Sequence, residues 1–90
     1  MKHFNWNDEK NKKLIEERGV SFERVVILIS RGEILDVVSH PNQERYPGQS
    51  MFVLDVDDYC YLVPFVEDGN EIFLKTIIPS RKATKKYLEK

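Results

Sequence analysis

The sequence contains little cysteine, glycine or proline: one Cys, four Gly and four Pro among 90 residues. A single cysteine, Cys60, excludes an internal disulfide, and its place inside an apolar run favours a core residue over a nucleophile. With 41% hydrophobic and 32% charged residues, the composition is typical of an ordered globular protein rather than a disordered one. The length predicts one small domain, residues 1–90, with a modest core.

Membrane and metal signals are also lacking. No apolar run reaches the length of a membrane span, and the start Met-Lys-His is not that of a signal peptide, so we expect a cytoplasmic protein without membrane association. The two histidines, His3 and His40, are far apart, and Cys60 has no His or Cys at ligand spacing. Phosphate-binding glycine loops and nucleophile elbows are absent as well. The sequence therefore predicts no metal and no cofactor.

Charge is nearly balanced overall, with a formal net charge of -1, but it is distributed unevenly. Residues 55–71 include six acidic residues and no Lys or Arg, whereas residues 75–90 include six basic residues and one acidic residue. This split predicts one surface for a polyanion and another for a different partner. Acidic residues are also common in hairpin turns, which is the plainer interpretation.

Two helices are expected in the first third of the chain. Asn7 can cap a helix over residues 8–18, whose first turn is acidic, and Gly19 ends it. Ser21 then caps a second helix that closes at Gly32. The apolar run in this second helix also suits a strand, but the cap and the closing glycine favour a helix.

The apolar residues of these helices predict how they pack. In the first helix, Leu14 and Ile15 are the large apolar residues, so we expect both to form a narrow stripe that faces inward. At the start of the second helix, Val20 and Val25 have the spacing of a hydrophobic staple.

Four strands are expected next, over residues 34–39, 51–56, 59–66 and 71–78. The last three are joined too tightly for crossovers, so the links are hairpins and the strands form an antiparallel meander. Pro64 removes a ladder donor and implies a bulge or an edge in the third strand. The predicted fold class is α+β: two N-terminal helices packed on a four-stranded antiparallel sheet, followed by a short basic C-terminal helix.

The C-terminal helix begins with an unusual charge pattern. Pro79 stops the last strand, and Ser80 can cap the helix that follows. Arg81 and Lys82 then fall in the first turn, where each exposed cation is unfavourable by about 0.3–1 kcal/mol at the positive end of the helix dipole. An anion bound there would remove this conflict.

A cationic stripe continues along the same helix. It consists of Arg81, Lys82, Lys85 and Lys86. Ala83 and Tyr87 lie one turn apart on another face that can pack against the sheet. Two interpretations remain open: a helix that binds an anion, or a solvated helix with one packed edge.

The candidate site combines this helix with the loop after the first predicted strand. If the fourth strand is central or next to the first, the loop and the helix meet at one end of the sheet. Together they offer an acid or base, cations for a phosphate and a ring for a base to stack on. Such a set suits cleavage of RNA by its own 2′-hydroxyl, which needs neither a metal nor an enzyme nucleophile. The candidates are His40, Glu44, Arg45, Tyr46, Lys75 and Arg81.

Each loop candidate also has a plainer interpretation. His40 precedes a proline and can be an ordinary loop residue. Glu44 and Arg45 can form a surface ion pair of little energetic value. Tyr46 can simply cover the core.

Four short motifs extend over nearly the whole chain. They are Phe4-x-Trp6-x-x-x-Lys10, Arg18-Gly19-Val20-Ser21-Phe22-Glu23, Glu44-Arg45-Tyr46 and Ile77-Ile78-Pro79-Ser80-Arg81-Lys82-Ala83-Thr84. In this order they resemble the successive signatures of the BrnT family of bacterial toxins. The resemblance implies a RelE-like fold and a type II toxin that acts as an endoribonuclease and inhibits translation. It also implies a cognate BrnA-type antitoxin, a ribbon-helix-helix protein through which DNA would be contacted only indirectly.

The resemblance carries over Glu44, Arg45 and Arg81 by motif and Lys75 by neighbourhood. In the resulting hypothesis Arg81 and Arg45 hold the scissile phosphate, with Lys75 as a further cation, and Glu44 or His40 moves protons. The residues expected to grip the RNA are Lys82, Lys85, Lys86 and Tyr46. The alternatives are a catalytically weak RNA- or protein-binding module of the same fold, and a purely structural partner subunit.

Overall fold

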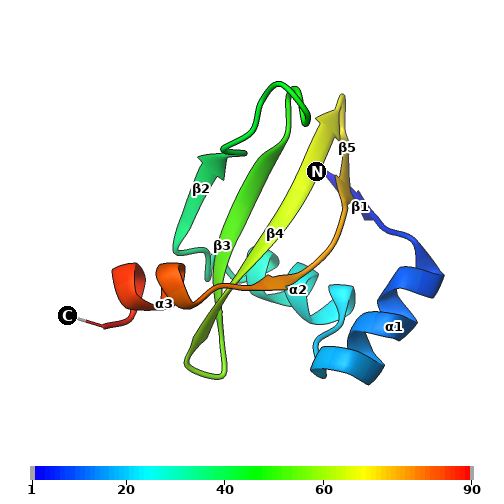
Figure 1. Ribbon diagram of the computed structural model, residues 1–90. Coiled ribbons are helices and arrows are strands. Elements are labelled where there is room, and N and C mark those ends of the chain that lie inside the picture. Colours follow the sequence, from blue (N-terminus) through cyan, green and yellow to red (C-terminus); the bar gives the residue numbers. More distant parts are fainter. Residues whose placement is uncertain (1, 90) are drawn as a thin grey trace.

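The computed structural model describes residues 2–89 and has an α+β architecture with three helices and a mixed sheet (Figure 1). None of the helices in this part of the chain is long and apolar enough to cross a membrane. The elements are β1 (His3–Asn5), α1 (Asp8–Arg18), α2 (Phe22–Ser30), β2 (Asp36–Ser39), β3 (Ser50–Val56), β4 (Tyr59–Asp68), β5 (Glu71–Leu74), β6 (Ile78–Pro79) and α3 (Arg81–Tyr87).

The sheet has the order β1-β5-β4-β3-β2, with β6 pairing with β4 beside this path. Strands β2 to β5 are antiparallel neighbours, so the predicted meander is confirmed. The prediction of a purely antiparallel, four-stranded sheet was wrong, because β1 adds to β5 in parallel, with Phe4 opposite Ile72. A strand of three residues is too short to show a period in the sequence, and only its pairing with β5 defines it.

The predicted fourth strand, residues 71–78, is divided into β5 and β6. The carbonyl of Pro64 accepts a hydrogen bond from the amide of Lys75 at 2.8 Å. The backbone nitrogen and oxygen of a strand residue point to the same side of the strand. The Pro64 nitrogen therefore also faces the segment of Lys75, but it has no hydrogen to donate. Pro64 predicted a bulge or an edge, and the ladder is interrupted there: three positions separate Leu62 from Phe65 on β4, whereas four separate their partners Leu74 and Ile78, so the facing segment contains one extra residue. The guanidinium of Arg18 donates to the carbonyl of Ile77 and supports the facing segment.

Local capping signals place both N-terminal helices where they were predicted. The Asn7 side chain accepts from the amide of Lys10 at 2.9 Å, and the Ser21 hydroxyl accepts from the amide of Arg24 at 3.1 Å. Gly19 ends α1 in the left-handed region, at φ 67°, which a residue with a Cβ rarely adopts.

The inward stripe of α1 differs from the prediction. Ile15 is 47% exposed, whereas Asn11 is buried beside Leu14. The Asn11 side-chain oxygen accepts from the amide of Phe22 at 2.8 Å, and its nitrogen donates to the carboxylate of Glu23 at 2.7 Å. These bonds turn Asn11 toward the start of α2, and because residues 11 and 14 share one helix face, Ile15 points outward.

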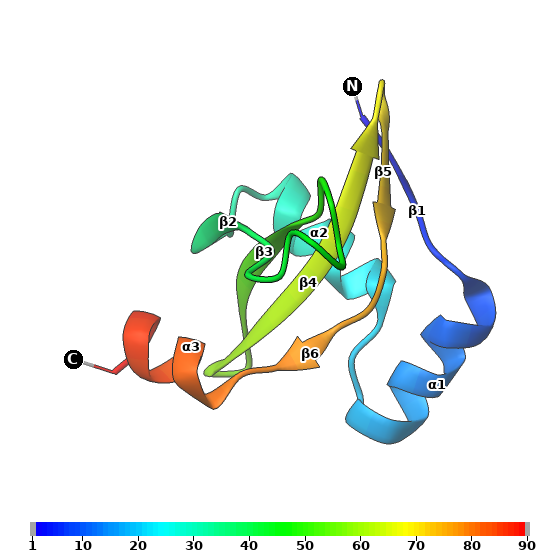
Figure 2. The same ribbon diagram turned by 45° about the horizontal axis from the view of Figure 1, so that its top comes forward.

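The helices cover both faces of the sheet. Residues of α1 and α2 pack with Phe52, Leu54 and the side chains that share their face. On the opposite face Val53 and Cys60 pack against Ala83 of α3, as predicted for the cysteine and for this edge of the helix. Figures 1 and 2 show α1 beside β1 and α3 at the other end of the molecule. The basic helix is therefore well separated from α1, and the sheet lies between it and α2 (Figure 1).

Candidate functional site

The loop of residues 40–49, between β2 and β3, is closed by a backbone hydrogen bond from the amide of His40 to the carbonyl of Gln49 at 2.9 Å and is braced by the side chain of Gln43. The side-chain nitrogen of Gln43, Nε2, donates to the backbone carbonyls of His40 and Gln49, at 2.8 and 3.1 Å. Its amide oxygen accepts from the amide of Gly48 at 3.2 Å. These three bonds add to the backbone bond and link the two ends of the loop through its interior. Sequence reasoning missed Gln43, since nothing in the sequence distinguishes it from the other polar residues of the loop.

His40 and Tyr46 lie against each other in this loop, with ring centroids 4.4 Å apart and planes inclined by 37°. His40 Nδ1 accepts a hydrogen bond from the amide of Asn42 at 3.1 Å. Because Nδ1 is an acceptor, the neutral ring carries its proton on Nε2 and presents a donor there. The Arg45 guanidinium lies 5.6 Å from the centroid of the Tyr46 ring, a cation–π distance.

A groove of about 240 Å³ joins the loop to the segment after β5. We call it the loop groove; it is lined by His40, Tyr46, Gln49, Pro64, Lys75, Thr76 and Ile78. Of the two arrangements that were predicted to allow this meeting, β5 is not next to β2, because β3 and β4 lie between them, but it is an inner strand of the sheet, between β1 and β4. The residues meet because the chain leaves β5 at Lys75 and continues along β4 through β6 toward α3 (Figure 2).

The remaining catalytic candidates lie outside the lining of the loop groove. Glu44 and Arg45 are exposed on the 40–49 loop, and Arg45 reaches the site through its contact with Tyr46. Arg81 is the first residue of α3 and is also exposed. The structure thus brings His40, Tyr46 and Lys75 together, with Arg45 adjacent, and does not add Arg81 to them.

A second groove, of about 380 Å³, lies beside α3 along the face of the sheet. In this α3 groove the apolar lining comes mainly from the strands, and Lys82 and Lys86 come from the helix. Lys85 is exposed and does not line it. Met51, in the α3 groove, pairs across the sheet with Pro64, in the loop groove, so the two grooves adjoin.

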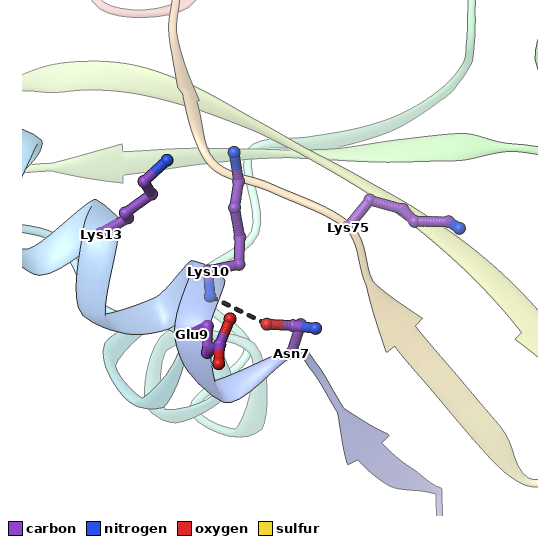
Figure 3. A pocket seen from close by; sticks show the side chains of 5 residues that line it. All are labelled: Asn7, Glu9, Lys10, Lys13 and Lys75. Carbon is purple, nitrogen blue, oxygen red and sulfur yellow. Dashed lines mark hydrogen bonds between the residues drawn. The ribbon is translucent and has the colours of Figure 1, made fainter.

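A third groove, of about 510 Å³, lies at the start of α1. This α1 groove is lined by Asn7, Glu9, Lys10, Lys13 and Lys75 (Figure 3). Lys75 also lines the loop groove, so the two grooves share a cation. Sequence reasoning assigned no role to Lys10 and Lys13; their spacing of three residues, which places both on one helix face, was the available signal.

Within residues 2–89 the buried titratable side chain is that of Cys60, which packs against Ala83 of α3. Burial raises the pKa of the Cys60 thiol, against a smaller opposing effect of the Thr84 hydroxyl. A raised pKa disfavours the reactive thiolate, which fits a packing role for this cysteine. Within residues 2–89, no three His, Cys, Asp or Glu side chains cluster in a way that suits a metal ion.

Comparisons of the chain with protein-family models, with curated proteins and with solved structures give no match. A functional assignment therefore depends on the geometry of the three grooves together with the sequence motifs.

Proposed function

We propose that the chain is a metal-independent endoribonuclease, the toxin of a type II toxin-antitoxin pair, which cleaves RNA in the cytoplasm and thereby inhibits translation. The observation that carries the proposal is the loop groove, in which His40, Tyr46 and Lys75 line one space. A ring for stacking, a proton donor and a phosphate-binding cation are what RNA cleavage through the 2′-hydroxyl requires of a protein. The BrnT resemblance and its RelE-like fold belong to the same proposal.

The reaction would use groups of the RNA itself. The 2′-oxygen forms a bond to phosphorus while the bond from phosphorus to the 5′-oxygen breaks, which leaves a 2′,3′-cyclic phosphate and a 5′-hydroxyl. One proton leaves the 2′-hydroxyl and one reaches the 5′-oxygen. Lys75 would stabilise the negative charge that develops on the phosphate, with Arg45 beside Tyr46 as a second cation.

The hydrogen bond from Asn42 to His40 bears on the direction of proton transfer. Since Nδ1 of His40 accepts this bond, the neutral ring carries its proton on Nε2 and can donate a hydrogen bond from there to a phosphate oxygen. To protonate the leaving 5′-oxygen, the ring would first take up a second proton at Nδ1 and so release the bond from Asn42. Glu44 belongs to the same loop and is exposed, so its carboxylate is our candidate to accept the proton of the 2′-hydroxyl. The sequence left these two roles open.

A cognate BrnA-type ribbon-helix-helix antitoxin would hold the enzyme inactive in the cell. The competing function is a binding module of the same fold that holds RNA or an acidic partner without cleaving it. The exposure of Arg81 outside the loop groove is the observation that favours this alternative.

Induced expression in a bacterium tests the proposal. We expect growth arrest with the unaltered chain and growth with His40→Ala, while Lys12→Ala, an exposed lysine of α1 outside the three grooves, should arrest growth as the unaltered chain does. The purified protein should release RNA fragments ending in 2′,3′-cyclic phosphate, and a chelator should leave the rate unchanged. Normal growth and intact RNA in the presence of folded, soluble protein would favour the binding module.

A further inference from the structure

The α1 groove contains three lysines and one glutamate. Of these charged residues, the proposed cleavage chemistry uses only Lys75. Lys10 and Lys13 project from α1, and Lys75 comes from the segment after β5 (Figure 3). Within residues 2–89 none of these three lysines forms an ion pair. Three cations against one carboxylate make the groove electropositive, which fits an anionic ligand.

The lysines are spread along the groove rather than aimed at one point. Figure 3 shows the side chain of Lys75 directed away from Lys10 and Lys13. A single phosphate would be held by cations that converge on it, whereas a polymer presents one phosphate after another. The arrangement therefore favours a chain of phosphates.

An exposed aromatic ring lies beside the cation that the two grooves share. Phe73 of β5 is 37% exposed, and the Lys75 ammonium lies 5.4 Å from the centroid of its ring. Residues 73 and 75 are two positions apart at the end of a strand, so they lie on one face of the sheet. In the loop groove Tyr46 has a similar companion, Arg45, at 5.6 Å. An aromatic ring next to a cation is the platform on which unpaired bases stack beside their phosphates.

We propose that the α1 groove binds single-stranded RNA beyond the cleavage point: Lys10 and Lys13 contact phosphates, and Phe73 stacks with a base. The strand then continues from the loop groove past Lys75 to the start of α1. Duplex RNA is excluded from the stacking contact because the neighbouring bases of the same strand already cover the faces of each base. This inference rests on the proposed function only in naming RNA as the polymer.

The test is fluorescence anisotropy with a labelled 2′-O-methyl RNA of about twelve nucleotides, within the range of single-strand sites. This probe lacks the attacking hydroxyl, so binding is measured without cleavage. One phosphate contact in a single strand contributes about 0.7 to the slope of log affinity against log salt, or about fivefold in affinity near 0.1 M. We expect Lys10→Ala with Lys13→Ala to weaken binding by about 25-fold and to flatten the slope by about 1.4.

Matched variants identify the source of these changes. Lys12→Ala removes a neighbouring exposed lysine that does not line the groove and should change affinity by less than twofold. Phe73→Leu should lower the affinity for single-stranded RNA by about fivefold or more and leave the salt slope unchanged, because it removes stacking and no charge. A duplex that contains the probe sequence should bind to the unaltered chain more weakly than the single strand does. Circular dichroism confirms that each variant is folded.

The outcomes separate this inference from the proposed function. If the unaltered chain binds the single strand with this dependence on Lys10 and Lys13 but cleaves no RNA, the groove assignment stands and the enzyme assignment fails. If the chain cleaves RNA while the double variant binds like Lys12→Ala, the groove assignment is wrong. Tighter binding of poly-L-glutamate than of RNA, with no effect of Phe73→Leu, would also overturn it and indicate a site for an acidic protein segment.

Discussion

Tyr87, on α3, donates its phenolic hydrogen to the carboxylate of Asp36, on β2, across 2.6 Å. The two residues are 51 positions apart in the chain. The bond fixes the end of the basic helix to the edge strand of the sheet, and so it sets the width of the α3 groove, which Tyr87 also lines. Lys82 and Lys86 line the α3 groove from a helix that is anchored at this point.

Loss of this bond should destabilise the protein in a pH-dependent way. The Tyr87 hydroxyl, followed by the amide of Val37, lowers the pKa of Asp36, and the Asp36 carboxylate raises the pKa of Tyr87. A lowered aspartate pKa contributes stability above about pH 4 that is lost as the pH falls through the folded-state value. A raised tyrosine pKa contributes stability below about pH 10 that is lost as the pH rises through its folded-state value.

We therefore expect Tyr87→Phe to lower the melting temperature most at neutral pH and progressively less below about pH 4. Thermal unfolding measured across this range checks the prediction. Tyr59→Phe is the control, because within residues 2–89 the structure gives the Tyr59 hydroxyl no hydrogen bond, and it should lower the melting temperature little at any pH. A Tyr87→Phe effect that is constant with pH would mean that the ring, not the hydrogen bond, anchors α3.

Thr84 makes a second connection between α3 and the sheet. Its buried hydroxyl accepts from the amide of Cys60 at 2.9 Å and donates to the carbonyl of Ser80 at 2.8 Å. Thr84→Val keeps the shape but leaves the Cys60 amide without a partner, so we expect a loss of about 1–3 kcal/mol in the free energy of unfolding. Urea denaturation measures it. Thr84→Ser keeps the hydroxyl and should lose less; an equal loss would assign the effect to the methyl group.

The lysines of α3 should contribute unequally to RNA binding. Lys82 and Lys86 line the α3 groove, which adjoins the loop groove, whereas Lys85 points elsewhere on the helix. Lys82→Ala with Lys86→Ala should lower the salt slope for single-stranded RNA by about 1.4. Lys85→Ala should lower it less. Equal effects per lysine would show that the helix acts only through its net charge.

The role of Arg81 can be separated from that of Lys75 by comparing cleavage rates. Sequence motifs assign Arg81 to the scissile phosphate, but in the structure it is Lys75 that shares the loop groove with His40. We expect Lys75→Met to reduce single-turnover cleavage by about 10²-fold or more, as for loss of a donor placed at the developing charge. Arg81→Lys, which keeps the charge and loses the forked geometry, should reduce it less.

Affinity measured on the same samples distinguishes binding from catalysis at these two positions. If Arg81→Lys keeps its RNA affinity and loses more cleavage than Lys75→Met, the motif-based assignment of Arg81 is correct and the phosphate lies nearer to α3. Equal losses of rate and affinity in Lys75→Met would make Lys75 an anchor rather than a stabiliser of the transition state.

The sequence by itself determined the local elements of the fold. Asn7, Gly19 and Ser21 mark helix ends through hydrogen bonds and backbone angles that reach only a few residues. Asp57 and Asp58 form the two-residue turn of a hairpin, with φ 54° and 68°, as the spacing of the flanking strands predicted. The individual candidates His40, Tyr46 and Lys75 were also visible, because each depends on residue type and on a nearby element boundary.

Only the tertiary structure decided which of these elements meet. Pro64 predicted an irregularity in the ladder, but the pairing of β1 with β5, the burial of Asn11 in place of Ile15, and the residues that the break at Pro64 brings together depend on partners distant in the chain. The break in turn brings Lys75 to His40 and places it between the loop and α1 grooves. Local propensities do not encode such meetings, because the hydrogen bonds and buried surface that stabilise them exist only once the sheet is assembled.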